Sequence, residues 1–251
     1  MPGSCEVPQD EAAAEFEWLL KEDVTNTLAR LTQILADCSA SVNQTPTNYN
    51  LVHSSLNQHD FVKVNLQLEG YKITCADINI RLASKHPIQT IKTCIKETPT
   101  NPFCWRLHQI QDAQNHLSNA IDLVSLTKGK KFETAEEVLF LIDNVMYSIQ
   151  RSRSSLLIPN KILIEELQHS QNMQAISPAL PLDYSISFYV HSQNLVCSVY
   201  HLAHVNNRPQ VKAEFQAEAP IGFLPEMLVL LSLAMQTCQQ LKDKIQTLVK
   251  I

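Results

Sequence analysis

Asp112 and His116 are the two side chains whose types and spacing come nearest to acid–base chemistry. They are four residues apart, which would place them on one face of a helix, where a carboxylate beside an imidazole can act as a general base. No nucleophile motif such as GxSxG accompanies them. We therefore interpret them as an exposed helical pair, and we expect no catalytic residue.

His201 and His204 could supply two ligands to a metal ion. A zinc or calcium site needs further ligands, and the sequence has no CxxC, HExxH or DxDxDG pattern. Its four glycines stand apart from one another, so neither a phosphate-binding P-loop nor a GxGxxG dinucleotide turn can form. The sequence predicts neither a metal nor a cofactor.

The charge of the chain gives it no general attraction for polyanions. With 20 basic and 25 acidic residues the formal net charge is −5, which favours neither nucleic acid nor an anionic membrane as a partner. One dense basic cluster, Lys128, Lys130 and Lys131, surrounds Gly129. It is interpreted either as a solvated turn between helices or as a local contact with phosphate or an acidic partner.

The seven cysteines form an odd number without paired spacing, as expected of free thiols in a reducing cytosol. Cys38 and Cys238 lie in apolar helical stripes and are predicted to be core thiols. The N-terminus lacks a basic start followed by an apolar run, so we expect no secretory signal. The longest apolar run, Met227 to Met235, covers half of the roughly 20 residues that a membrane crossing needs, so no span is expected.

The stretch from Trp105 to Leu126 is predicted to be the central helix. Its apolar residues recur three or four apart, which puts them on one face. Gln109 and Asp112 belong to the opposite polar face, which would meet water or a second partner. Trp105, like Trp18, could pack in the core or anchor a partner, and we favour packing.

Three further helices are predicted from stripes and caps. The first starts near Asp10 and ends before Pro46, and the next opens with a capping box at Thr134 to Glu137. The last starts at Pro225 with a stripe of Leu228, Leu231, Met235, Cys238, Leu241, Ile245 and Leu248. These steps of 3, 4, 3, 3, 4 and 3 form a heptad with one discontinuity, so a long regular leucine zipper is not expected.

Alternating apolar and polar residues predict strands in two separate regions. A phase slip at Ala76 and Asp77 is interpreted as a bulge or a bend. A turn is predicted at Gly70 and Tyr71, and a hairpin around Ser192 to Asn194. The predicted strands are 62–69, 73–82, 90–96, 184–190, 195–202 and, more weakly, 211–218.

The order helix, strands, two helices, strands, helix predicts an α+β fold. Helices from distant parts of the chain must gather into one antiparallel four-helix bundle, and the strand regions into one antiparallel sheet. The predicted helical domain comprises 10–45, 103–176 and 224–251. The predicted β-sheet domain comprises 47–100 and 178–220.

Five sequence blocks resemble the Rogdi family, in the same order and through nearly the whole chain. The connection from Val205 to Lys212 is shorter than the family pattern. The resemblance therefore does not extend to this loop or to the strand edge beside it. The blocks are EFEWLLKEDV (15–24), WRLHQIQDAQNHLSNAI (105–121), TAEEVLFLIDNVM (134–146), PALP (178–181) and CQQLKDKI (238–245).

The resemblance implies a non-enzymatic, elongated molecule with a helical-bundle domain and a β domain. It implies a subunit of the rabconnectin complex, the counterpart of yeast RAVE, which helps to reassemble the vacuolar-type proton ATPase. The implied partners are large WD-repeat rabconnectin subunits and peripheral pump subunits. The implied location is cytoplasmic, on vesicles including synaptic vesicles, with the nuclear envelope as a further site. No catalytic or partner-binding residue carries over.

Two other functions remain open from the residues. One is a hydrolase-like or ligand-binding protein with an apolar pocket between bundle and sheet. The other is a self-associating helical protein outside this pathway, although the sequence does not indicate a homo-oligomer.

Overall fold

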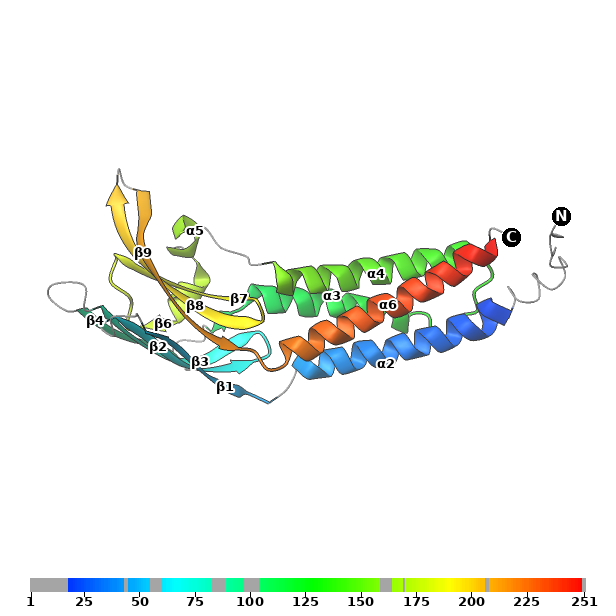
Figure 1. Cartoon of the computed structure of the whole chain (residues 1–251), viewed down its shortest axis with the longest axis horizontal. Coiled ribbons are helices and arrows are strands. Elements are labelled where there is room, and N and C mark those ends of the chain that lie inside the picture. Colours follow the sequence, from blue (N-terminus) through cyan, green and yellow to red (C-terminus); the bar gives the residue numbers. More distant parts are fainter. Residues whose placement is uncertain are drawn as a thin grey trace, which may run out of the picture. The chain divides into compact units, whose positions relative to one another are not determined.

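A computed structural model of the chain describes residues 18–42, 45–54, 60–82, 89–96, 104–158, 164–168, 170–205 and 208–249, and it is a mixed helix and sheet structure (Figure 1). Two units share it. The helical unit is Met1–Ser41, Gln114–Arg153 and Glu226–Ile251, and the sheet unit is Val42–Ala113 and Ser154–Pro225. The predicted α+β class is confirmed at this level. The domain boundaries, the elongated shape and the four-helix bundle stay predictions.

Four long helices contribute to the helical unit, and Figure 1 shows them running alongside one another. A five-residue π-helical turn, Leu19–Asp23, leads into the first of them. The predicted start at Asp10 lies outside the described residues. The helices are α2 (Val24–Val42), α3 (His108–Ser125), α4 (Ala135–Leu157) and α6 (Leu224–Val249).

Each of these helices buries one row of residues at alternating steps of three and four, the spacing of a heptad seam. In α6 the row contains Met227 and Ala234 where the sequence predicted Leu228 and Met235, so the predicted discontinuity is wrong. Spacing along the seam, and not side-chain size, decides which residue faces inward. The rows are Val24, Leu28, Leu31, Leu35 and Cys38; Leu117, Ala120 and Val124; Ala135, Val138, Ile142, Val145, Ile149 and Ser152; and Met227, Leu231, Ala234, Cys238, Leu241 and Ile245.

Polar contacts tie the same helices together at their margins. The Asn119 amide of α3 donates to the Ser148 hydroxyl of α4 at 2.8 Å. Lys242 of α6 pairs with Asp143 of α4 at 2.6 Å, and Lys244 pairs with Asp23 at 2.8 Å. Exposed ion pairs of this kind contribute about 0–1 kcal/mol each, so the buried rows supply most of the stability.

The strands form one antiparallel sheet in the order β6-β4-β3-β2-β1-β9-β8-β7, with β5 pairing β3 beside this path. A single residue pair, Val52 with Glu218, joins β1 to β9. The short helices α5 (Ile164–Gln168) and η2 (Gln171–Ala175) precede β6. The strands are β1 (Thr47–Ser54), β2 (Phe61–Glu69), β3 (Lys72–Leu82), β4 (Gln89–Lys96), β5 (Trp105–Arg106), β6 (Ile176–Ser177), β7 (Tyr184–His191), β8 (Asn194–Val205) and β9 (Arg208–Pro220).

The structure confirms both predicted tight turns. Gly70 has φ of +57° between β2 and β3, and Ser192 and Gln193 have φ of +49° and +67° between β7 and β8. Two central residues with positive φ match the right-handed twist of the paired strands. In the shortened connection, Val205 pairs directly with Arg208, so β8 and β9 remain paired up to it.

The bulge of β3 lies at Thr74, so its predicted position at Ala76 and Asp77 is wrong. Gln67 pairs with Cys75 and Leu68 with Ile73, which leaves Thr74 as the extra residue. Beyond it the buried positions become Ala76, Ile78, Ile80 and Leu82. Strict alternation from Ile73 would bury Cys75, and the inserted residue Thr74 shifts the buried face to Ala76.

The central helix begins at His108, so the prediction that it starts at Trp105 is wrong. Trp105 and Arg106 form β5, paired with Ile73 and Lys72. The side chain of Trp105 is 1% exposed and meets the ring of Phe188 edge to face at 5.2 Å. This confirms packing for Trp105, whereas Trp18 is 58% exposed, so the same prediction is wrong for Trp18.

Strand β7 is buried on both faces from Tyr184 to Val190, although its alternation predicted one wet face. Its edge is completed by Gln109 in the first turn of α3, a residue that the sequence had placed on the polar face, which was expected to meet water or a second partner. The Gln109 amide accepts from the Val190 N–H at 2.8 Å and donates to the Val190 carbonyl at 3.0 Å. It also donates to the Ile158 carbonyl, beyond the end of α4, at 3.0 Å.

A leucine in a buried row is expected to matter far more than an exposed one. Leu35→Ala removes a fully buried side chain and should lower the free energy of unfolding by about 2–5 kcal/mol. Leu126→Ala, at a side chain 81% exposed, should change it by less than about 0.5 kcal/mol. Denaturant unfolding of the full chain measures both. Equal effects would contradict the packing described for α2.

Replacing Gln109 tests how β7 is held. Gln109→Leu keeps a side chain of similar size but leaves the Val190 N–H and carbonyl without these bonds, so the unfolding free energy should fall by about 2–4 kcal/mol. Hydrogen exchange of the Val190 amide should speed up. Gln150→Leu, at an exposed position of α4, is the matched control. Unchanged exchange at Val190 would show that the amide does not hold this edge.

Candidate functional site

The residues that the sequence singled out for acid–base chemistry do not form a catalytic arrangement in the described part of the chain. Asp112 is exposed and His116 half-buried on α3, and neither side chain makes a hydrogen bond or ion pair there. His201 is buried, stacks on Tyr184 with ring centroids 5.2 Å apart, and lies 3.7 Å from the Asp183 carboxylate. Its surroundings are those of a packed core histidine.

Metal binding finds no support in the described residues. No group of three or more histidine, cysteine, aspartate or glutamate side chains is placed to hold an ion in the described ranges. The side chain of His204 lies outside them. In the same part of the chain, no helix is long and apolar enough to cross a membrane.

The thiols of Cys38 and Cys238 lie in the buried rows, as predicted. Burial raises the pKa of each to about 12, and the nearby Glu226 carboxylate adds to the shift at Cys38. Cys197, fully buried in β8, has its pKa raised by the same cause. Such thiols stay protonated near neutral pH and are poor nucleophiles.

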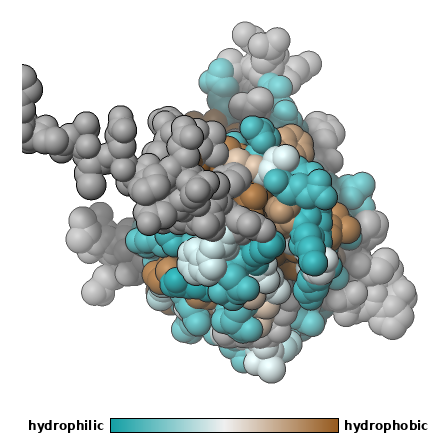
Figure 2. All heavy atoms as spheres, turned by 90° about the vertical axis from the view of Figure 1, so that its right-hand side faces the viewer, coloured by the Kyte–Doolittle hydropathy of each residue, from teal (hydrophilic) through white to brown (hydrophobic). Residues whose placement is uncertain are grey.

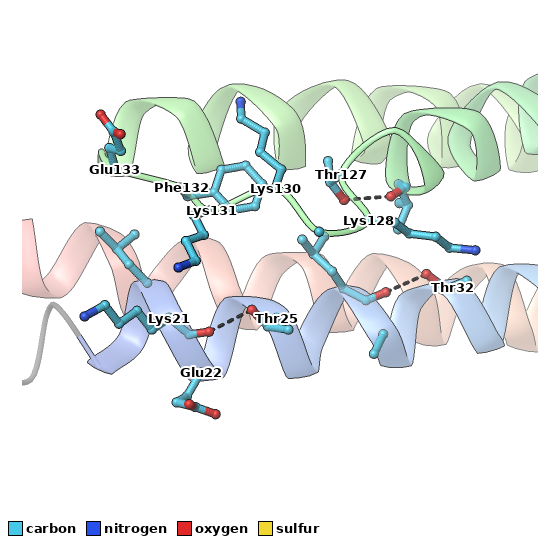
Figure 3. A pocket seen from close by; sticks show the side chains of 15 residues that line it. Lys21, Glu22, Thr25, Thr32, Thr127, Lys128, Lys130, Lys131, Phe132 and Glu133 are labelled. Atoms are coloured by element: carbon cyan, nitrogen blue, oxygen red, sulfur yellow. Dashed lines mark hydrogen bonds between the residues drawn. The ribbon is translucent and has the colours of Figure 1, made fainter.

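A groove of about 890 Å³ lies within the helical unit, between the first half of α2 and the connection from α3 to α4. Leu20, Leu28 and Val124 are buried at its base. Thr25 and Ala29 of α2 are exposed along its wall. We call this feature the lysine-rimmed groove, because Lys21, Lys128, Lys130 and Lys131 also line it (Figure 3).

The turn between α3 and α4 places the lysines. Thr127 donates its hydroxyl to the Val124 carbonyl at 2.6 Å, and Gly129 takes a φ of +79°, which a side chain would disfavour. Lysines just beyond a helix C-terminus are favourable because the helix dipole is negative there. The turn therefore accounts for part of this clustering without any ligand.

The lysines of the groove are engaged to different degrees. Lys130 lies 3.8 Å from the Glu137 carboxylate and 5.1 Å from the centre of the Phe132 ring. The side chains of Lys128 and Lys131 make no hydrogen bond or ion pair with the part of the chain that the structure describes. In Figure 3, Lys131 reaches toward α2, and Glu22, in the π-helical turn before α2, also lines the groove.

The capping box at the start of α4 is formed in part. Thr134 accepts from the Glu137 N–H at 3.3 Å, as predicted, while the Glu137 carboxylate reaches the N–H of Glu133 at 3.5 Å. Glu137 therefore restrains the loop that forms one wall of the groove.

Sequence reasoning identified the lysine turn and missed its apolar counterpart. Lys21 and Leu28 are about a hundred positions away along the chain, and no local pattern shows that they meet the turn. Figure 2, viewed from the right of Figure 1, shows hydrophilic side chains interspersed with small apolar patches on the coloured surface. Recognition on such a surface has to combine charge with limited apolar contact.

Comparison with known proteins identifies relatives along most of the chain. The family described as "Rogdi leucine zipper containing protein" matches residues 15–250. Protein rogdi of Drosophila melanogaster is 38% identical over 241 residues, covering 92% of this chain and 86% of that protein. Protein rogdi homolog of Homo sapiens is 31% identical over 265 residues, covering 92% and 90%. The Caenorhabditis elegans homolog is 26% identical, covering 89% and 84%.

Thiol reactivity should separate the buried cysteines from the half-buried ones. At pH 8 a thiol with a pKa of about 12 is ionised to a fraction of about 10⁻⁴, so Cys38 and Cys238 should resist alkylation while Cys75 and Cys104 react. Mass spectrometry after iodoacetamide treatment measures each site, and unfolding should expose all of them. Alkylation of native Cys38 as fast as Cys104 would contradict its burial.

The same raised pKa values have a consequence for stability. The folded state favours the neutral thiols, so their contribution is fully present below the ordinary pKa of 9.0 and is lost as pH rises toward about 12. Replacing both Cys38 and Cys238 with alanine should flatten this alkaline decline in unfolding free energy. An equally steep decline in that variant would assign it to other groups.

Proposed function

This chain belongs to the Rogdi leucine zipper containing protein family, and on that basis we propose that it is a non-catalytic adaptor subunit of a rabconnectin or RAVE-like complex. The complex promotes assembly of the vacuolar-type proton ATPase and thereby acidification of vesicles and organelles. The carrying observation is the match to Protein rogdi of Drosophila melanogaster across 92% of this chain, which includes segments of both units.

The proposal includes partners and place. The partners are large WD-repeat subunits of the complex and peripheral subunits of the pump. The chain acts in the cytoplasm, bound at the surface of vesicles, synaptic vesicles among them.

The four-helix bundle belongs to the same proposal. It is supported by heptad rows on four helices, since rows with this spacing typically pack against one another in bundles. A bundle whose apolar rows face inward leaves its outer surface for other proteins.

Affinity purification tests the adaptor function. The tagged full chain, recovered from cytosol at physiological salt, should retain very large WD-repeat proteins together with peripheral pump subunits, identified by mass spectrometry. The tag alone is the control for adhesion to the matrix. Recovery of the chain without these proteins would count against the proposal.

Loss of the gene provides a second readout in cells. Organelle pH should rise and the association of the two pump sectors should fall, because the adaptor promotes their assembly. Re-expression of the chain should restore both. Unchanged acidification and unchanged sector association after deletion would refute the proposed role.

A further inference from the structure

From the lysine-rimmed groove we infer that the helical unit binds an acidic amphipathic helix of a partner protein. The inference rests on the proposed function in one respect, because an adaptor needs a surface that recognises another protein. It adds the place and the chemistry of one such contact.

The dimensions of the groove suit a short helix. Its helical wall, made of the turn η1 (Leu19–Asp23) and the first half of α2, runs from Leu20 to Thr32, a length of about 18 Å at the α-helical rise, or about three turns. Buried leucines form the base, while Thr25 and Ala29 are small and allow a second backbone to approach closely. A helix lying in such a groove inserts apolar side chains at steps of three and four.

The threonine hydroxyls on the wall of the groove are already hydrogen-bonded within their own helix. The Thr25 hydroxyl already donates to the Lys21 carbonyl at 2.7 Å, and the Thr32 hydroxyl donates to the Leu28 carbonyl at 2.8 Å. Covering these residues therefore leaves no hydroxyl without a partner. An apolar strip on the occupant matches this wall.

The charge of the rim selects the sign of the occupant. Lys128 and Lys131 have no side-chain hydrogen bond or ion pair within the described residues, whereas Lys21, on the same rim, has an interaction of its own. Two carboxylates, Glu22 and Glu133, also line the groove, so its four lysines outnumber its acidic residues by two (Figure 3). These cations stand out in a chain of net charge −5, so the local field attracts acidic residues.

The groove favours a peptide over a nucleic acid or a lipid surface. Its cations border a concave apolar trough, whereas a bilayer or a duplex presents a broad surface and would also meet the net negative charge of the chain. An acidic amphipathic helix provides both the apolar strip for the base and the carboxylates for the rim.

Fluorescence anisotropy with the purified full chain tests the inference. The probe is a labelled synthetic helix of about 18 residues with leucine at steps of three and four and glutamate elsewhere. It should bind, and more weakly as salt rises. Lys128→Glu with Lys131→Glu should raise its Kd at least about tenfold. Ala29→Trp, which fills the groove from an exposed position, should also weaken binding.

Matched controls separate the groove from general charge. Lys63→Glu with Lys92→Glu makes the same charge change at exposed positions of the sheet and should leave the Kd within about twofold. A scrambled peptide of identical composition, without the apolar strip, should bind at least about tenfold more weakly. Circular dichroism confirms that each variant is folded.

The inference fails if the groove variants bind the probe as tightly as the unaltered chain, or if the scrambled peptide binds equally well. Binding of phosphatidylserine vesicles that the groove variants lose, without binding of the peptide, would overturn it in favour of a membrane contact. The assay uses the purified chain alone, so its failure is distinct from failure to capture pump subunits.

Discussion

The bonds between Gln109 and the edge of β7 are the interaction on which the arrangement of the sheet unit most depends. One side-chain amide takes the place of a neighbouring strand for Val190 and also reaches the carbonyl of Ile158. Asn172 does the same for β5, accepting from the Arg106 N–H at 3.1 Å and donating to its carbonyl at 3.2 Å. A chain that builds its sheet from separated segments leaves strand edges, and buried edges need such partners because unpaired backbone groups are costly.

The helices are held together by regularly spaced apolar residues and not by side-chain hydrogen bonds to backbone edges. Their buried rows step by three and four, and the row of α6 runs unbroken from Met227 to Ile245. Leucine zippers have this heptad spacing, but here the rows are buried within a single chain. The family description and the heptad spacing of these rows therefore agree.

The sequence predicted the elements whose signal is periodic and missed the features that depend on distant residues. The strand from Phe61 to Glu69 and the turns at Gly70 and Ser192 followed from local pattern and turn chemistry. The strand at Trp105 did not, because its pairing partner Ile73 lies more than thirty positions away. Gln109 was placed on the polar face because it lies off the apolar stripe, and the sequence left open whether that face meets water or a second partner; its burial is evident only once β7 lies beside it.

At the candidate site, the lysine turn was likewise predicted from local sequence, while the residues that meet it are distant in the chain. The clustering of its lysines costs electrostatic repulsion, which nearby groups partly compensate. Like charges close together repel one another, and the end of α3 compensates for part of that repulsion through its dipole. Lys130 is further balanced by Glu137 and by the ring of Phe132. For Lys128 and Lys131, the dipole of α3 is the only compensation among the described residues. An acidic occupant of the groove would therefore reduce the remaining repulsion between these lysines.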